Sequence, residues 1–263
     1  MSEGRPRVRT ERHGHVLAIV LDRPEKRNAA DLRLLSELAA AYGELDRDTS
    51  LRAGAVLAEG AHFTAGLDLA DIGPRIGSGG LDFVPEGGLD PWGLRTAPVS
   101  KPVVIGLKGT CLTLGIELAL ASDVVVAEES TRFGQIEVAR GILPFGGATL
   151  RFPRTAGWGD AMRWILTGDE FDAAEAHRIG LVQEVVADGA VDEAALALAG
   201  RIAAQAPLAV QAALANARLA VAASESEAAS ALPAQLARLA ASDDARIGME
   251  AFLARSTAEF TGR

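Results

Sequence analysis

The stretch PVVIGLKGTCLTLGIELALASDVVVA, from Pro102 to Ala127, holds two short apolar runs with a helical segment between them. Pro102 to Leu107 and Asp123 to Ala127 are rich in β-branched residues, which is the signal of a strand. Gly115 to Ser122 lies between them and has the composition of a short buried helix. The order of these elements predicts an α/β fold.

The chain before this stretch repeats the pattern loosely. Asn28 or Asp31 could cap a helix, because both side chains accept hydrogen bonds from exposed helical N–H groups. Loosely recurring ββα units suit a stack of sheet turns better than a doubly wound sheet. The expected elements are strands over His15–Leu21 and Ala53–Ala58, and helices ending near Leu45 and spanning Ala70–Ile76.

The segment Gly77 to Val99 has a different composition, with many glycines and prolines and few aliphatic residues. A loop of this length inside a compact domain is usually a lid, a binding loop or a mobile segment. We expect substrate preference to be decided there.

The chain becomes mostly helical after Gly157, and its last third is rich in alanine. We expect a core with the site over residues 1–200 and a C-terminal helical region over 201–263. Apolar stripes that one small bundle cannot bury suggest contacts between subunits. The expected helices are Asp160–Thr167, Ala173–Ile179, Asp192–Gln205, Ala209–Ala223 and two more within Ala228–Phe260.

Composition excludes several classes of protein. A net charge of −9 and a pI near 5.0 argue against a nucleic-acid surface. The basic stretch Arg5 to Arg12 is expected to be a solvated arm. No apolar stretch could span a membrane, and no signal peptide is expected. The single cysteine, Cys111, fits a reducing compartment, so we expect a cytoplasmic protein.

The segment AHFTAGLDL, from Ala61 to Leu69, follows an expected buried strand and has an unusual composition for a turn. Ala65-Gly66 allows a sharp turn, which would leave the peptide N–H of Leu67 pointing into open space. The alternative is an ordinary turn between a strand and a helix, with Asp68 near the N-cap.

Glu117 lies in the otherwise apolar run LTLGIELALA. A carboxylate there must find partners or have a raised pKa, and both are signatures of a candidate site. Leu114 lies at the helix start, where free N–H groups favour a developing anion. The alternative is a structural carboxylate, hydrogen-bonded inside the fold.

Glu137 is a second acid among apolar neighbours, in the segment FGQIEVARGILP. Two carboxylates around one water can act as general acid and general base when their environments separate their pKa values. Arg140 could pair with either glutamate or be a surface charge.

Other chemistries lack support in the sequence. The four histidines have no metal-ligand spacing, so no metal site is expected. Cys111 sits in an apolar run without a basic neighbour, which favours packing over nucleophilic catalysis. Neither a GxSxG elbow nor a nucleotide-phosphate loop is present.

In their order, these segments resemble the crotonase (enoyl-CoA hydratase/isomerase) family from about Arg12 to Phe260. The matching stretches are RPEKRNA (23–29), HFTAGLDL (62–69), GIELALASD (115–123), FGQIEVARGILPFGGATLRFPR (133–154), AMRWILTGDEFDAAEAHRIGLVQEVV (161–186) and FLARSTAEF (252–260).

The resemblance implies a spiral of ββα turns, a helical C-terminal trimerisation region and an acyl-CoA substrate. The peptide N–H groups of Leu67 and Leu114 would form the oxyanion hole for the thioester oxygen. Glu117 and Glu137 would be the two catalytic glutamates, with Glu137 in the larger acid role.

The resemblance also implies where the rest of the substrate binds. No separate cofactor is implied, since coenzyme A is part of the substrate, and the assembly would be a homotrimer or a dimer of trimers. The implied CoA contacts are Lys26, Arg27, Ala65, Asp68 and Arg255, and the implied acyl-pocket residues are Phe145 and Trp92.

Two departures from the family pattern matter. Thr113-Leu114-Gly115 replaces a glycine run and could reshape the acyl pocket. Phe145 stands where dienoyl-CoA isomerases have an aspartate, which counts against that reaction. Hydration of a 2-trans-enoyl-CoA is the leading hypothesis. The alternatives are isomerisation or other enolate chemistry in the same site, and an acyl-CoA-binding protein without turnover.

Overall fold

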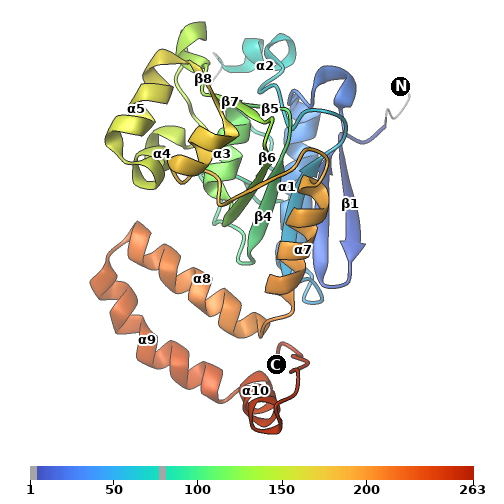
Figure 1. Cartoon of the computed structure of the whole chain (residues 1–263), viewed down its shortest axis with the longest axis vertical. Coiled ribbons are helices and arrows are strands. Elements are labelled where there is room, and N and C mark those ends of the chain that lie inside the picture. The colour runs from blue at the N-terminus through green and yellow to red at the C-terminus, as the bar shows by residue number, and fades with distance from the viewer. Residues whose placement is uncertain (1–4, 77–80) are drawn as a thin grey trace.

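A six-stranded sheet forms the centre of the computed structural model, which describes residues 5–76 and 81–263 (Figure 1). Its strand order is β1-β2-β3-β4-β6-β9, and every neighbouring pair is parallel except the antiparallel pair β1 and β2. The strands are β1 (Val8–His13), β2 (Val16–Leu21), β3 (Ala53–Ala58), β4 (Val103–Leu107), β6 (Val124–Glu128) and β9 (Glu184–Val186).

Successive turns of the chain add to a second, three-stranded sheet of order β5-β7-β8. One turn runs through β4, then β5 (Thr110–Leu112), then helix α3 (Leu114–Ala121). The next runs through β6, then β7 (Arg132–Gly134), then the 3₁₀ helix η2 (Glu137–Arg140). Strand β8 (Glu170–Asp172) completes the small sheet. This repetition confirms the predicted stack of ββα turns.

Helices cover both faces of the large sheet. α1 (Leu32–Arg47) is capped by the Asp31 side chain, which confirms one of the two expected caps. Its apolar stripe joins the main hydrophobic core. α7 (Val191–Ala203) packs on β2, β3, β4 and β6 and closes a second, smaller core. Because both faces are covered, β2 and β3 are buried along their whole length.

The N-terminal basic stretch is not a solvated arm. Residues Val8–His13 form β1, the edge strand of the large sheet. Arg9 and Arg5 both pair with the buried Asp22 carboxylate, at 2.9 and 2.7 Å. The prediction was wrong because this stretch pairs with β2 along its whole length, although Val8 is its one buried residue and no apolar alternation marks the strand.

Five further short helices in the described part of the chain connect these strands. Helix α4 was not expected from the sequence, which has Pro153 within its span. These elements are η1 (Pro24–Lys26), α2 (Leu69–Ile76), α4 (Ala148–Ala156), α5 (Trp158–Thr167) and α6 (Ala173–Arg178).

Three long helices extend from the core at the C-terminal end (Figure 1). They are α8 (Pro207–Ala222), α9 (Glu225–Ala240) and α10 (Asp243–Ala254), after which residues 255–263 are irregular. Part of FLARSTAEF is therefore outside the last helix. These helices leave large apolar side chains exposed, namely Val221, Leu232, Leu236, Met249, Phe252 and Leu253.

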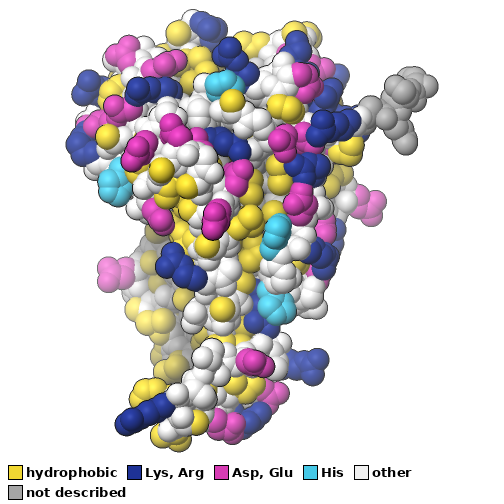
Figure 2. Space-filling view, turned by 45° about the vertical axis from the view of Figure 1, so that its right-hand side comes forward, with side chains coloured by type: hydrophobic (Ala, Val, Ile, Leu, Met, Phe, Trp, Pro, Cys, Tyr) yellow, Lys and Arg dark blue, Asp and Glu magenta, His cyan; other side chains and the backbone are white. Residues whose placement is uncertain are grey.

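The long segment predicted as a lid or binding loop is only partly described, because residues 77–80 lie outside the described residues. Residues 81–99 are irregular but packed, with Leu81, Phe83, Asp90 and Trp92 buried. None of the described helices is long and apolar enough to cross a membrane. Figure 2 shows Lys and Arg interspersed with Asp and Glu on the face drawn, without a basic patch.

Candidate active site

A cavity of about 190 Å³ lies where the turn before α2, the segment 81–95, α3 and η2 meet. Its wall is largely apolar, with Leu35, Leu69 and Leu81 among the lining residues. Five polar side chains also line it: Arg95, Thr113, Glu117, Glu137 and Arg140. An apolar cavity with a few convergent polar groups is the usual form of a small-molecule site.

Leu67 and Leu114 both line this cavity, as their predicted roles require. The Gly66 φ of +95° turns the chain just before Leu67, which lies in a bridge to Ala30. Leu114 is the first residue of α3. Within the described residues, neither N–H has a hydrogen-bond acceptor. Two free peptide donors on one cavity can hold a carbonyl oxygen that gains negative charge.

Thr113 directly precedes Leu114 and has an unusual backbone conformation. Its φ of 49° and ψ of −113° lie outside the regions that β-branched residues adopt easily. Its N–H donates to Gly134 O at 2.9 Å, which ties the start of α3 to β7. Its hydroxyl is buried against Gly66 and has no hydrogen-bond partner in the described part of the chain. The residue that replaces the glycine run therefore fits only under local strain.

Glu117 is held by the N-terminus of α4. Its Oε1 accepts from the peptide N–H groups of Gly146 at 2.7 Å and Ala148 at 3.1 Å. Burial raises the pKa of Glu117, while those N–H groups and the Arg151 charge oppose the rise. The α4 dipole also favours an anion at this end of the helix. The carboxylate is thus fixed in one orientation.

Glu137 begins η2 and lines the same cavity with far fewer partners. Gln135 Nε2 donates to its Oε1 at 2.8 Å, while its buried Oε2 has no partner among the residues that the structure describes. Burial, with a smaller contribution from the Glu117 charge, raises the pKa of Glu137 to about 7. Such a group can give or take a proton at neutral pH. Sequence reasoning missed Gln135, although it is a buried polar residue two positions before an acid.

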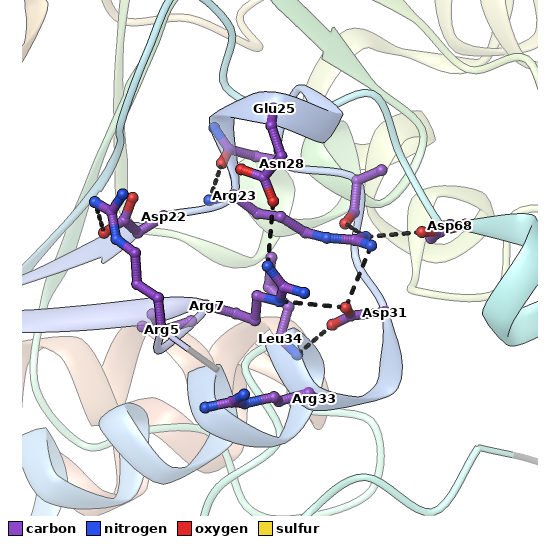
Figure 3. A network of polar contacts seen from close by, with 12 residues as sticks. Arg5, Arg7, Asp22, Arg23, Glu25, Asn28, Asp31, Arg33, Leu34 and Asp68 are labelled. Carbon is purple, nitrogen blue, oxygen red and sulfur yellow. Dashed lines mark hydrogen bonds and ion pairs between the residues drawn. The ribbon is translucent and has the colours of Figure 1, made fainter. Parts of the chain in front are cut away.

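A polar network fixes the turn that precedes Leu67 (Figure 3). The buried Arg23 side chain bonds to Ala29 O at 2.7 Å and to Asp68 at 2.8 Å. Asn28 donates to Glu59 O and His62 O, both at 2.9 Å, and so joins the turn to the end of β3. Asp68 is therefore engaged in an ion pair within the protein.

Three of the predicted CoA-binding residues, Lys26, Arg27 and Ala65, lie near one another in the structure. Lys26 and Arg27 are exposed on η1 and its cap, and Arg27 O accepts from Ala65 N at 2.9 Å. Ala65 in turn lines the cavity. Arg255 ends α10, which Figure 1 places at the opposite end of the molecule from α2. The Arg255 contact stays a prediction.

Phe145 and Trp92, the predicted acyl-pocket residues, both line the cavity. Trp92 Nε1 donates to Leu114 O at 3.2 Å, which links the segment 81–95 to α3. Arg140 lines the cavity too and forms no ion pair with either glutamate. Sequence reasoning missed Arg95, because nothing in its neighbourhood marked it as a wall residue.

Other chemistries gain no support within the described residues. These contain no cluster of three or more His, Cys, Asp or Glu side chains that could hold a metal ion. Cys111 is buried and unpaired, and burial raises the pKa of its thiol far above the usual range. A buried neutral thiol is a poor nucleophile.

Comparisons with known proteins agree with this geometry. A family model described as Enoyl-CoA hydratase/isomerase matches residues 11–263. The crystal structure of a probable enoyl-CoA hydratase/isomerase from Mycobacterium abscessus is 55% identical, with a TM-score of 0.96, and 98% of this chain and 99% of that chain are covered. Enoyl-CoA hydratase EchA19 of Mycobacterium tuberculosis is 33% identical over 216 residues, which are 81% of this chain and 80% of the relative.

Proposed function

The chain belongs to the enoyl-CoA hydratase/isomerase (crotonase) family, and from that premise we propose that it adds water across the 2,3 double bond of a 2-trans-enoyl-CoA. The observation that carries this proposal is the pair Glu117 and Glu137 on one cavity, in different environments. A water molecule between two such carboxyl groups has both a base and an acid beside it.

The proposed reaction follows from the positions of the four groups. The thioester oxygen binds the N–H groups of Leu67 and Leu114 and takes up negative charge as the enolate forms. Glu117 accepts a proton from water, whose oxygen bonds to Cβ. Glu137 gives its proton to Cα, and the carboxyl groups then re-equilibrate the proton they hold. Loss of one oxyanion-hole donor typically costs about 2.7–4 kcal/mol of transition-state stabilisation.

A second candidate reaction is isomerisation of a 3-enoyl-CoA in the same cavity. The half-partnered Glu137, with a pKa of about 7, supports it because one such acid can move a proton between two carbons. The cavity also suits an acyl-CoA-binding protein without turnover, but such a protein has no use for two buried acids around one water.

Hydration can be tested by the loss of enone absorbance of crotonyl-CoA and of a longer 2-enoyl-CoA, with mass spectrometry of the products. The expected result is a gain of one water that is absent in the double variant Glu117→Gln, Glu137→Gln. A product of unchanged mass from 3-enoyl-CoA, without hydration, favours isomerisation. Tight ester binding without either product favours the binding protein.

The oligomer and the rest of the CoA site belong to the same proposal. Exposed apolar side chains on α9 and α10 support self-association as a homotrimer or a dimer of trimers. Light scattering of the wild type and of Leu236→Glu should report a smaller particle for the variant. An unchanged mass would argue against that surface.

A further inference from the structure

Two arginines remain in the cavity wall after the proposed reaction has used Glu117, Glu137 and the two peptide donors. These are Arg95, from the segment 81–95, and Arg140, at the end of η2. The reaction needs neither of them, and the cavity around them is otherwise lined mainly by aliphatic and aromatic side chains. Both arginine side chains are exposed to solvent, so their guanidinium groups lie at the mouth of the cavity rather than deep inside it. A plain hydrocarbon tail gains nothing from a guanidinium there, whereas an anionic group can bind it.

Arg95 is held in place by the protein and still has free donors. Its guanidinium carbon lies 4.8 Å from the centre of the Phe83 ring, which is a stacking distance. Its Nη1 lies 3.4 Å from Oδ2 of the buried Asp90, and this is its one side-chain hydrogen bond within the described residues. Since an arginine has five N–H donors, most of them remain available.

A chain of contacts sets Arg95 apart from the proposed thioester position. Trp92 bonds to Leu114 O, and Phe83 meets the Trp92 ring edge-on at 5.9 Å. Arg95 then stacks on Phe83. Two aromatic rings thus connect Leu114 to the Arg95 guanidinium through successive contacts. A group that meets Arg95 belongs to the far part of an acyl chain rather than to the thioester.

Arg140 supplies charge that the protein does not neutralise. Its side chain has no ion pair or hydrogen bond with any residue in the described ranges 5–76 and 81–263. Arg95 has a partial counter-charge in Asp90, whereas Arg140 has no ion pair with any described residue. Because Arg140 is exposed, water solvates this charge, but a guanidinium without a protein partner still favours an anionic ligand over a neutral one. It suits a carboxylate because the two can form paired hydrogen bonds.

We propose that the cavity accepts an acyl-CoA whose acyl chain ends in a carboxylate, with Arg95 and Arg140 as the residues that recognise that group. This inference rests on the proposed function for the thioester position, and it narrows the substrate class from enoyl-CoA esters in general to those of dicarboxylic acids. In this proposal the two glutamates of the cavity wall carry out the reaction, and the two arginines recognise the substrate.

Binding of saturated esters tests this without any turnover. Isothermal titration calorimetry would compare adipyl-CoA with hexanoyl-CoA, and suberyl-CoA with octanoyl-CoA, so that each pair differs only in the terminal carboxylate. We expect the diacid ester to bind about tenfold more tightly in at least one pair, since a charge-assisted hydrogen bond contributes on that scale. No preference at either length overturns the proposal. Because these esters cannot be hydrated, this result is separate from success or failure of the hydratase assay.

Variants identify the residues responsible. Arg95→Gln and Arg140→Gln should each reduce the diacid preference several-fold. Arg163→Gln is the matched control, because Arg163 also stacks on a ring, at 4.4 Å from Trp164, but does not line the cavity. A preference that survives both cavity variants overturns the assignment. If Arg140→Gln weakens the binding of both esters of a pair equally, Arg140 binds a phosphate of CoA rather than the terminal carboxylate. That result also overturns the assignment.

Two further controls close the test. The CoA ester of 6-hydroxyhexanoic acid has a neutral polar end. If it binds as tightly as adipyl-CoA, the arginines bind any oxygen acceptor, and the proposed specificity for an anion is overturned. If Arg95→Gln fails to fold, as judged by its thermal unfolding, Arg95→Lys keeps the charge but loses the planar fork. A lower diacid preference in that variant supports the proposal, and an unchanged one counts against the role of Arg95.

Discussion

Helix α3 and the 3₁₀ helix η2 each bring one glutamate to the same cavity, but they hold it differently. Glu117 on α3 accepts from peptide groups at the start of α4, at 2.7 and 3.1 Å. Among the described residues, Glu137 on η2 has a single side-chain donor at 2.8 Å and one oxygen without a partner. Identical side chains therefore receive different properties from their partners. One carboxylate is fixed, and the other can change its protonation near neutral pH.

The largest effect should come from Glu137→Gln. Gln cannot exchange a proton, so we expect kcat for enoyl-CoA hydration to fall by about 10³-fold, within the usual range for general acid–base groups. Steady-state kinetics would measure it, with the exposed Glu129→Gln as control. A small loss in this variant, beside a large one in Glu117→Gln, would reverse the roles assigned to α3 and η2.

Gly146→Ala should act mainly on the Glu117 carboxylate, which is the nearest group to the added Cβ. A Cβ at this position would lie 2.4 Å from Glu117 Oε2, so the carboxylate must move. Displacement of a catalytic group by about 1 Å can cost roughly 10²-fold in rate, and we expect a loss of kcat on that scale. Gly159→Ala is the control, since its Cβ would meet nothing within 4 Å. Full activity in Gly146→Ala would show that the orientation of Glu117 is not critical.

Gln135→Met should change the pH profile more than the maximal rate. The Gln135 amide stabilises the charged form of Glu137 and so lowers its pKa. Without it the pKa rises above about 7. If protonated Glu137 is the acid, the high-pH limb of kcat/KM should move to higher pH. A limb that stays in place would assign it to another group.

The smallest effect is on stability. The pKa of Glu137 is raised from 4.5 to about 7, so the folded state binds this proton more tightly than the unfolded chain does. Wild-type stability should therefore fall as pH rises through this window, by about 2–3 kcal/mol. Glu137→Gln removes the effect, so thermal unfolding should favour the variant more at pH 8 than at pH 5. Equal differences at both pH values would contradict the raised pKa.

Much of the fold could be predicted from the sequence because apolar periodicity marks buried strands and helices directly. The two glutamates could be found for a related reason, since an acid inside an apolar run is conspicuous. Strand β1 and helix α4 could not, because no apolar alternation marks the first and the second has Pro153 within its span. The hydrogen-bond partners of Glu117 and the position of Arg95 in the cavity wall depend on segments about 20 to 30 residues away in the sequence. No local sequence pattern therefore predicts them.

Strand β1 has a further consequence for the behaviour of the protein in concentrated solution. Its partner β2, VLAIVL, is apolar along its length and would offer an ideal template for edge-to-edge pairing between chains if it were the outermost strand. β1 covers that edge with a strand whose last four residues, Thr10–His13, are exposed and mostly charged or ionisable. Charged edge strands are a common protection against aggregation. We therefore expect a chain shortened past His13 to aggregate more readily than the full chain, because the apolar edge of β2 would be exposed.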